Sequence, residues 1–245
     1  MKYLKRMLLL IFVVYLLPTF ASAGFWAIKE RPGRWSEANW GSAHILPEAG
    51  ESKEAAVYIF SAATGGLKGS VASHAWIVTK EKGASDYIRY DKVGWGNPIR
   101  RNHRPPDAYW YSNPPQLVVQ AKGAEAELLI PKIEGAIAAY PYSEPGGYTI
   151  WPGPNSNTFV AYVLRNVPEL GAVLPPHAVG RDYLPDGDFW HLDADGRDLH
   201  VTLRGLLGFS VGMRSGFELH FLGLVAGIDI TDPGIKVPAI GRIGI

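Results

Sequence analysis

Residues 148–165 read YTIWPGPNSNTFVAYVLR: a short apolar run, a Pro-Gly-Pro turn, and a helix that opens at Asn155-Ser156-Asn157. The predicted helix, 157–166, places four apolar side chains on one stripe, namely Phe159, Val160, Val163 and Leu164. This stripe indicates a helix whose N-terminus is anchored against a core. A helix N-terminus presents unpaired N–H groups and the positive end of the helix dipole, so a hydroxyl there is favoured for developing negative charge. This is the one segment with the form of an active site.

The chain around this segment alternates between short strands and a few helices. Runs rich in β-branched and aromatic residues predict strands, and a longer apolar run predicts a second helix that Pro131 either starts or kinks. The expected strands are 55–62, 74–79, 87–93, 116–121, 189–192 and 199–203, the last two forming a hairpin, and the expected second helix is 124–139, with Leu128, Leu129, Ile133 and Ile137 on one face. The pattern predicts an α+β fold, an antiparallel sheet packed with a few helices.

Residues 24–50 show no regular period, although they are rich in Trp, Gly and Pro. We expect an irregular Trp-rich N-terminal arm. Its Trp26, Trp35 and Trp40 have two interpretations: burial against the core or a surface on which carbohydrate stacks.

The N-terminus has the three parts of a secretory signal. Lys2, Lys5 and Arg6 precede an apolar run, and the sequence 21–23, Ala-Ser-Ala, is a cleavage site. We predict a signal peptide over 1–23 and a single domain over 24–245, periplasmic or secreted after cleavage. The alternative is an uncleaved segment that anchors the protein to the inner membrane.

Composition excludes several classes of function. The chain has no Cys, which excludes disulfides and thiol nucleophiles. Loss of the three cations of the signal peptide changes the formal charge from +1 to −2, which argues against nucleic-acid binding. Neither a P-loop nor a dinucleotide-binding glycine pattern occurs, so we expect no cofactor. The aspartates within 186–198 lack the glycine spacing of a calcium loop; turn chemistry accounts for them, and we predict no metal.

Two surface segments carry open alternatives. The basic run Arg100–Arg104 is expected to be a solvated loop, with contact to an anionic lipid or cell-wall polymer as the alternative. Residues 205–230 are apolar, but charged residues interrupt them too often for a membrane span. This segment either completes the domain core or forms a membrane-facing apolar surface.

The order of elements resembles the circularly permuted papain-like hydrolases, which include relatives of NlpC-type cell-wall peptidases and lecithin retinol acyltransferase. His74 opens a strand, and the helix with Asn155-Ser156-x-x-Phe159 follows later in the chain, as in that group. The group's nucleophile is a Cys, so Ser156 is a departure, and a hydroxyl needs stronger base assistance than a thiol.

Over most of the mature chain the sequence is similar to an uncharacterised bacterial family, domain of unknown function 3750. The matching stretches are 35–40, 73–77, 93–96, 154–159, 180–183 and 223–229. This similarity identifies kin and implies no known activity.

The papain-like resemblance implies amide or ester hydrolysis. Ser156 would be the nucleophile, His74 the base and Asp91 the residue that orients the imidazole. Asn155 and Asn157 would donate to an oxyanion or shape the loop, and Trp76 and Trp151 would wall a pocket.

Each of these residues also has a structural interpretation. Ser156 is then the N-cap of the helix, His74 a strand histidine bonded to backbone, and Asn155 and Asn157 turn and cap residues; Trp76 and Trp151 are core residues.

Two functions therefore remain open: an exported envelope hydrolase acting on peptide amides or acyl esters, or a catalytically inactive envelope module that binds cell-wall peptide, lipid or protein, with peripheral membrane association.

Overall fold

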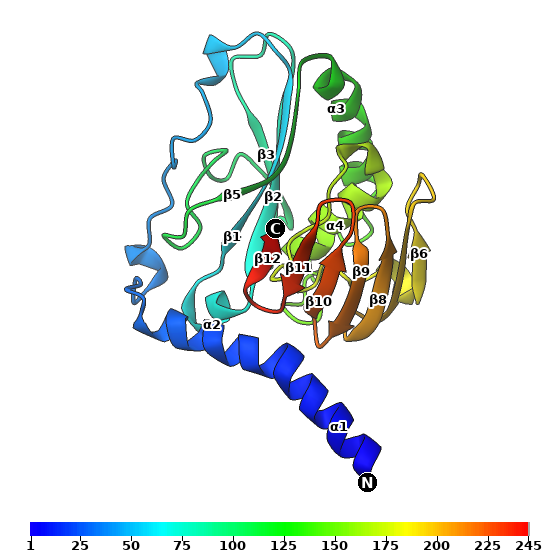
Figure 1. Cartoon of the computed structure of the whole chain (residues 1–245). Helices are drawn as coiled ribbons and strands as arrows, with labels where there is room; N and C mark the ends of the chain where they lie inside the picture. Colours follow the sequence, from blue (N-terminus) through cyan, green and yellow to red (C-terminus); the bar gives the residue numbers. More distant parts are fainter. Residues whose placement is uncertain (245) are drawn as a thin grey trace.

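The computed structural model describes residues 1–244 as two antiparallel sheets, two helices packed with them, and a long N-terminal helix (Figure 1). This arrangement confirms the α+β class. The five-stranded sheet is built from the first half of the chain and the seven-stranded sheet from the last quarter.

The N-terminal helix runs without interruption from Lys2 to Ile28: α1 (Lys2–Ile11), a π-helical segment and α2 (Leu17–Ile28). Its 27 residues have a mean hydropathy of 2.2 in the most apolar window, so by length and composition it fits a signal peptide or a membrane anchor. Trp26 is buried, and its Nε1 donates to Gly66 O at 2.8 Å. The expected irregular arm therefore begins after Ile28 and not at residue 24, because helix continues through the first apolar residues of that arm.

All neighbouring strands of the five-stranded sheet are antiparallel. In spatial order they are β4 (Ile99–Arg101), β3 (Ile88–Lys92), β2 (Ser73–Lys80), β1 (Ala56–Ala63) and β5 (Gln116–Lys122). The expectation that the basic run Arg100–Arg104 is a solvated loop is partly wrong. Arg100 and Arg101 belong to the edge strand β4 and pair with β3.

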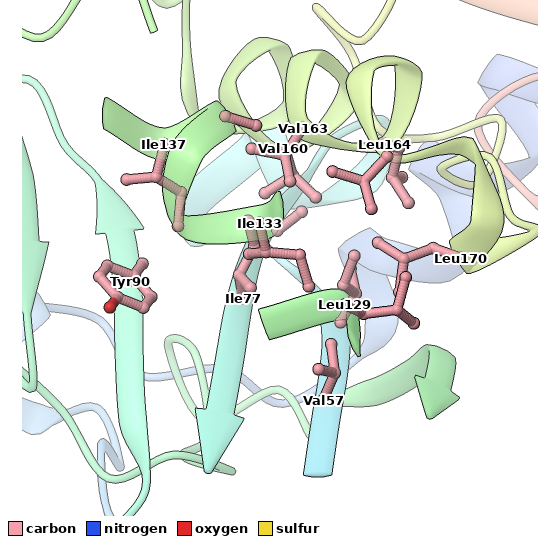
Figure 2. Packing of buried hydrophobic residues seen from close by; sticks show 14 of the residues in the cluster. Val57, Ile77, Tyr90, Leu129, Ile133, Ile137, Val160, Val163, Leu164 and Leu170 are labelled. Atoms are coloured by element: carbon pink, nitrogen blue, oxygen red, sulfur yellow. The ribbon is translucent and has the colours of Figure 1, made fainter. Parts of the chain in front are cut away.

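Helices α3 (Gly123–Ala138) and α4 (Ser156–Asn166) pack on one face of this sheet. Figure 2 shows the core between them, where Ile77 of β2 meets Ile133 of α3 and Val160 of α4. Pro131 lies inside α3 and does not start it. Leu128, expected on the buried face, is 72% exposed, because the helical turn carries it to the solvent side.

The other face of the five-stranded sheet is aromatic. Phe60, Trp76 and Trp110 pack there under the arm that contains Trp40. The Trp35 and Trp40 rings contact each other at a tilt of 43°, with centroids 5.4 Å apart, and Trp35 remains half exposed. Side chains of β2 alternate between the two cores, so Ala75 and Ile77 face α4 whereas Trp76 and Val78 face the arm.

The seven-stranded sheet is a meander in which each strand pairs with the next. Its strands are β6 (Trp190–Leu192), β7 (Asp198–Leu203), β8 (Leu207–Gly212), β9 (Gly216–Phe221), β10 (Leu224–Asp229), β11 (Gly234–Val237) and β12 (Gly241–Gly244). The β6–β7 hairpin confirms the expected pairing of 189–192 with 199–203. The polar side chains of this sheet, such as His200 and Glu218, are buried, and its apolar side chains, such as Phe209 and Ile235, are exposed.

Candidate functional site

His74 lies on the aromatic face of the five-stranded sheet. It shares this face with Trp76, two residues along the strand, and its ring lies flat on Trp110, with centroids 3.6 Å apart and planes 2° from parallel. The residue is 5% exposed, and burial lowers the pKa of the imidazole against the opposing effect of Asp91. His74 is therefore an enclosed ring whose charged form is disfavoured by burial.

The structure brings His74 and Asp91 together. Nε2 of His74 lies 2.9 Å from Oδ1 of Asp91, and Arg89 grips the same carboxylate with Nε at 2.6 Å from Oδ2 and Nη2 at 2.8 Å from Oδ1. Burial raises the pKa of Asp91, but the charges and hydrogen bonds of Arg89 and His74 outweigh burial and hold it below its usual range. Arg89 also lies over Trp76, 4.1 Å from the ring.

The structure does not bring Ser156 to this group. Helix α4 packs on the opposite face of the sheet from His74, and its first turn contacts the start of β2 through Asn157, whose Nδ2 donates to Ser73 O at 2.9 Å. Across residues 1–244, no hydrogen bond joins His74 to Ser156. The alternation of strand side chains explains the separation, because Ser73 and Ala75 point toward α4 and His74 points away.

The N-cap of α4 is Asn155, so the interpretation of Ser156 as the cap is wrong. The Asn155 side chain accepts hydrogen bonds from the N–H groups of Asn157 at 2.9 Å and Thr158 at 3.1 Å, and its amide donates to Ile150 O and Val179 O, each at 3.0 Å. Ser156 is the first helical residue, 3% exposed.

Asn155 and Asn157 hold three chain segments together. Nδ2 of Asn157 donates to Val179 O at 2.8 Å as well as to Ser73 O, and Asn155 bonds the same Val179 carbonyl. Gly180 lies so close that a Cβ there would stand 2.2 Å from Nδ2 of Asn155. Their amides are thus occupied by backbone.

Ser156 has a different polar neighbourhood, in Tyr148 and Lys92. Burial raises the pKa of the Tyr148 phenol, and hydrogen bonding by the side chain and backbone of Ser156 opposes that rise. Nζ of Lys92 lies 5.8 Å from the Tyr148 ring centroid, and burial lowers the pKa of Lys92 to about 8. Sequence reasoning missed Lys92; its place beside Tyr90 in the alternation of β3 was the available signal.

The two tryptophans play different parts. Trp76 is fully buried, and its Nε1 donates to Pro106 O at 2.8 Å. Trp151 is 49% exposed and donates to Leu222 O at 3.0 Å, so it joins the loop before α4 to the turn between β9 and β10. They lie apart and do not wall one pocket.

An open groove lies on the arm side of the sheet, beside the His74–Asp91–Arg89 network. Its volume is about 530 Å³, within the usual range for small-ligand sites. The lining comes from the arm, the β2–β3 connection and the loop after β4, and includes His44, Glu48, Asp86, His103 and Arg104. Sequence reasoning missed this groove, because its walls are irregular and distant along the chain.

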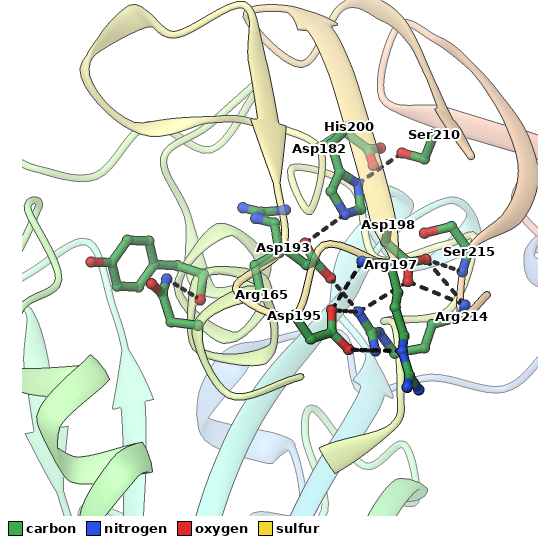
Figure 3. Close-up of polar contacts among 12 residues, drawn as sticks. Arg165, Asp182, Asp193, Asp195, Arg197, Asp198, His200, Ser210, Arg214 and Ser215 are labelled. Atoms are coloured by element: carbon green, nitrogen blue, oxygen red, sulfur yellow. Dashed lines mark hydrogen bonds and ion pairs between the residues drawn. The ribbon is translucent and has the colours of Figure 1, made fainter. Parts of the chain in front are cut away.

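A buried polar network covers the inner face of the seven-stranded sheet (Figure 3). Asp193 Oδ1 lies 3.0 Å from Nε2 of His200, whose Nδ1 lies 2.9 Å from Oγ of Ser210. The three side chains are linked in the order of a catalytic triad, but Ser210 is 0% exposed. The adjoining cavity, about 20 Å³, has room for about one water. The Ser210 hydroxyl is therefore out of reach of a substrate.

Arg214 pairs with the aspartates that were expected to serve turn chemistry. Its guanidinium lies 3.0 Å from Asp193, 2.8 Å from Asp195 and 3.0 Å from Asp198. These carboxylates neutralise a cation as well as shaping turns.

Within residues 1–244, one group of side chains could converge on a metal ion. It consists of Asp182, Glu218 and His220, whose ligand atoms lie within 4.8 Å of one another. Glu218 is already paired with Arg181 and with Nζ of Lys236 at 2.5 Å. The two cations hold the pKa of Glu218 below its usual range although burial raises it. A divalent ion there would face two fixed positive charges, so the donor set fits an internal ion-pair network better than a metal.

Comparisons with known proteins place the chain in a family without adding a chemistry. No curated protein and no solved structure matches it significantly, and the resemblance to papain-like hydrolases stays a prediction. The sequence profile of one family, described as a protein of unknown function (DUF3750), matches residues 54–183, which include β1 to β5, both packed helices, His74, Asp91 and Ser156. Since this match covers more than half of the chain, the protein belongs to the DUF3750 family.

Proposed function

We propose that this protein is a catalytically inactive envelope module that binds a short peptide in the groove beside the Trp-rich arm. The observation that carries the proposal is the position of His74, which is bonded to Asp91, stacked on Trp110 and directed away from Ser156. A general base must lie within hydrogen-bond reach of the proton it removes. In this arrangement His74 instead supports the groove.

Two sets of bonds fix the groove walls. Nη1 of Arg89 donates to Pro105 O at 2.8 Å, and Trp76 donates to Pro106 O, so the His74–Asp91–Arg89 network holds the loop after β4. Asp107, in the same loop, accepts from Ser42 Oγ at 2.6 Å and from Ile45 N at 2.8 Å, which ties the arm to it. A preorganised wall of this kind reduces the ordering cost of binding.

The side chains that line the groove favour a ligand that carries both a positive and a negative charge. Arg104 is stacked on Trp40, 4.4 Å from the ring, and offers a guanidinium for a carboxylate. Glu48 and Asp86 line the same groove and offer carboxylates for an amine. A cell-wall peptide, which carries amines and carboxylates on a short chain, fits this pattern. The apolar N-terminal helix supports an envelope location for the domain.

The test is isothermal titration calorimetry, in which the full-length protein is titrated with a soluble cell-wall stem peptide. Arg104→Gln should weaken binding by about tenfold or more, equivalent to ~1.4 kcal/mol. Arg101→Gln, at an exposed position of the edge strand β4, is the matched control and should bind as the wild type does. Absence of binding by the wild type, or equal losses in the two variants, would argue against the proposal.

A second candidate is a serine hydrolase that uses Tyr148 and Lys92 in place of His74. Its support is the contact of Ser156 with Tyr148 at the start of α4, and a lysine beside that tyrosine with a pKa lowered to about 8. A lysine with such a pKa is closer to a neutral base at physiological pH. The burial of Ser156 counts against this candidate.

A further inference from the structure

We infer that the outer face of the seven-stranded sheet is a membrane-docking surface that rests in the acyl region of the bilayer beside the N-terminal helix. The inference is independent of the proposed ligand groove. It begins with the inverted pattern of this sheet, which buries its polar side chains and exposes its apolar ones.

The register places apolar residues in rows that cross the sheet. One row takes a residue from each of the first six strands, and these are Leu192, Leu199, Val211, Phe217, Ile228 and Ile235. Ile243 of β12 completes the row beside Ile235. A parallel row runs from Trp190 through Phe209 and Leu219 to Ala226. Neither row contains a charged side chain.

The opposite face explains why these residues are exposed. The row behind them contains His200, Ser210, Glu218 and Lys236, which are nine-tenths or more buried and bonded to each other or to neighbours. Strand side chains alternate, so a sheet that turns this polar row inward must turn its apolar row outward. Exposed apolar patches of this extent mark interaction sites.

The N-terminal helix identifies the occupant. Its first part, α1, carries Leu4, Leu8 and Leu10 more than half exposed, and the whole helix is long and apolar enough to span a bilayer. The helix meets the domain at Tyr15, whose hydroxyl donates to Leu219 O at 2.9 Å and whose ring lies 5.3 Å from Phe221. The lipid around α1 therefore extends to the sheet at Leu219 and Phe221, the two residues that Tyr15 contacts.

The helix and the apolar face form a continuous surface. Val14 lines an apolar hollow of about 340 Å³ together with Phe217, Leu219, Ile228 and Ile235. Trp151 is half exposed and bonded to Leu222 in the β9–β10 turn, next to the Phe221 ring that Tyr15 contacts, and a half-exposed Trp suits the membrane interface. In the protein that retains this helix, lipid acyl chains fill the hollow and cover the rows, so the helix anchors the protein and the outer face of the sheet docks on the same bilayer.

The test uses the absence of native Cys in the full-length protein. Single variants Phe209→Cys and Ile235→Cys place an environment-sensitive fluorophore on the outer face, and Leu128→Cys on α3 is the matched control at an exposed leucine. Each protein is reconstituted into phosphatidylcholine bilayers, and quenching by acyl-chain doxyl lipid is compared with quenching by aqueous iodide. Leu219→Cys replaces either outer variant if that variant fails to unfold cooperatively.

Labels at 209 and 235 should lose most of their fluorescence to doxyl lipid and resist iodide, whereas the label at 128 should show the reverse. Iodide quenching at all three positions would overturn the inference. Protection from both quenchers at 209 and 235, with a dimeric mass in detergent, would also overturn it and assign the face to a second copy of the chain.

Discussion

Nε2 of His74 lies 2.9 Å from Oδ1 of Asp91, on the face of the five-stranded sheet opposite to α4 and Ser156. The position of His74 is the main support for the proposed binding function, because His74 belongs to the buried Asp91–Arg89 network and makes no hydrogen bond to Ser156 within residues 1–244.

Asp91→Asn should destabilise the fold by roughly 3–5 kcal/mol, because Arg89 is 1% exposed and would lose its charged partner. Urea unfolding followed by circular dichroism measures the loss. Asp86→Asn, at an exposed position, should change the free energy of unfolding by less than about 0.5 kcal/mol. Equal stability of the Asp91 variant and the wild type would show that the network is not structural.

Asn155→Ala should cost about 1–2 kcal/mol, because its side chain caps two N–H groups of α4. Ser156→Ala should cost less than Asn155→Ala, since Ser156 is not the cap. Thermal and urea unfolding of the two variants side by side provide the comparison. The reverse order of the two losses would contradict the assignment of the cap.

Gly180→Ala should destabilise strongly, by about 2 kcal/mol or more, because φ at Gly180 is +96° and the added Cβ would clash with the Asn155 amide. Gly50→Ala is the control, as a Cβ at Gly50 meets nothing within 4 Å and its φ is not in the left-handed region. Comparable stability of the two variants, measured by urea unfolding, would refute the close approach at Gly180.

His177 should make the fold less stable at low pH. Burial, with a smaller effect of Arg181, lowers its pKa to about 4, so below about 6.5 the unfolded state binds a proton that the folded state does not. The free energy of unfolding should fall as pH decreases from about 6.5 to about 4. At 1.36 kcal/mol per pKa unit, the loss approaches about 3 kcal/mol.

Urea unfolding of wild type and His177→Gln across this pH range measures that contribution. The variant should show a shallower fall, while the lowered pKa values of His74 and His191 leave part of the dependence in place. An unchanged slope in His177→Gln would mean that His177 titrates alike in both states.

Local patterns in the sequence predicted both packed helices and half of the strands that the structure describes, but not β4 or the strands from β8 to β12. The strand expected at 74–79 is β2, Ser73–Lys80, and the helix expected at 157–166 is α4, Ser156–Asn166, because period-two and period-3.6 patterns reflect which side chains meet a core. Asp91 was also expected as the partner of His74, from the papain-like resemblance, and the two side chains are bonded.

The sequence could not show on which face of the sheet each residue lies. A strand pattern identifies two faces but not which of them a helix covers, so His74 and Ser156 could be assigned to one cleft although they occupy opposite sides. The same ambiguity hid the inverted C-terminal sheet. In β9, Glu218 and His220 alternate with apolar residues, but only the packed fold shows that these two polar residues are its buried side.

The most direct test of the central claim is covalent labelling of the full-length protein by a serine-reactive fluorophosphonate, with Ser156→Ala, His74→Ala and Tyr148→Phe as comparisons. The account predicts no labelling of the folded wild type above the level of Ser156→Ala. Labelling abolished by both Ser156→Ala and His74→Ala would contradict it and restore the papain-like dyad. Labelling that needs Ser156 and Tyr148 but survives His74→Ala would also contradict the binding account, in favour of the Tyr148–Lys92 site.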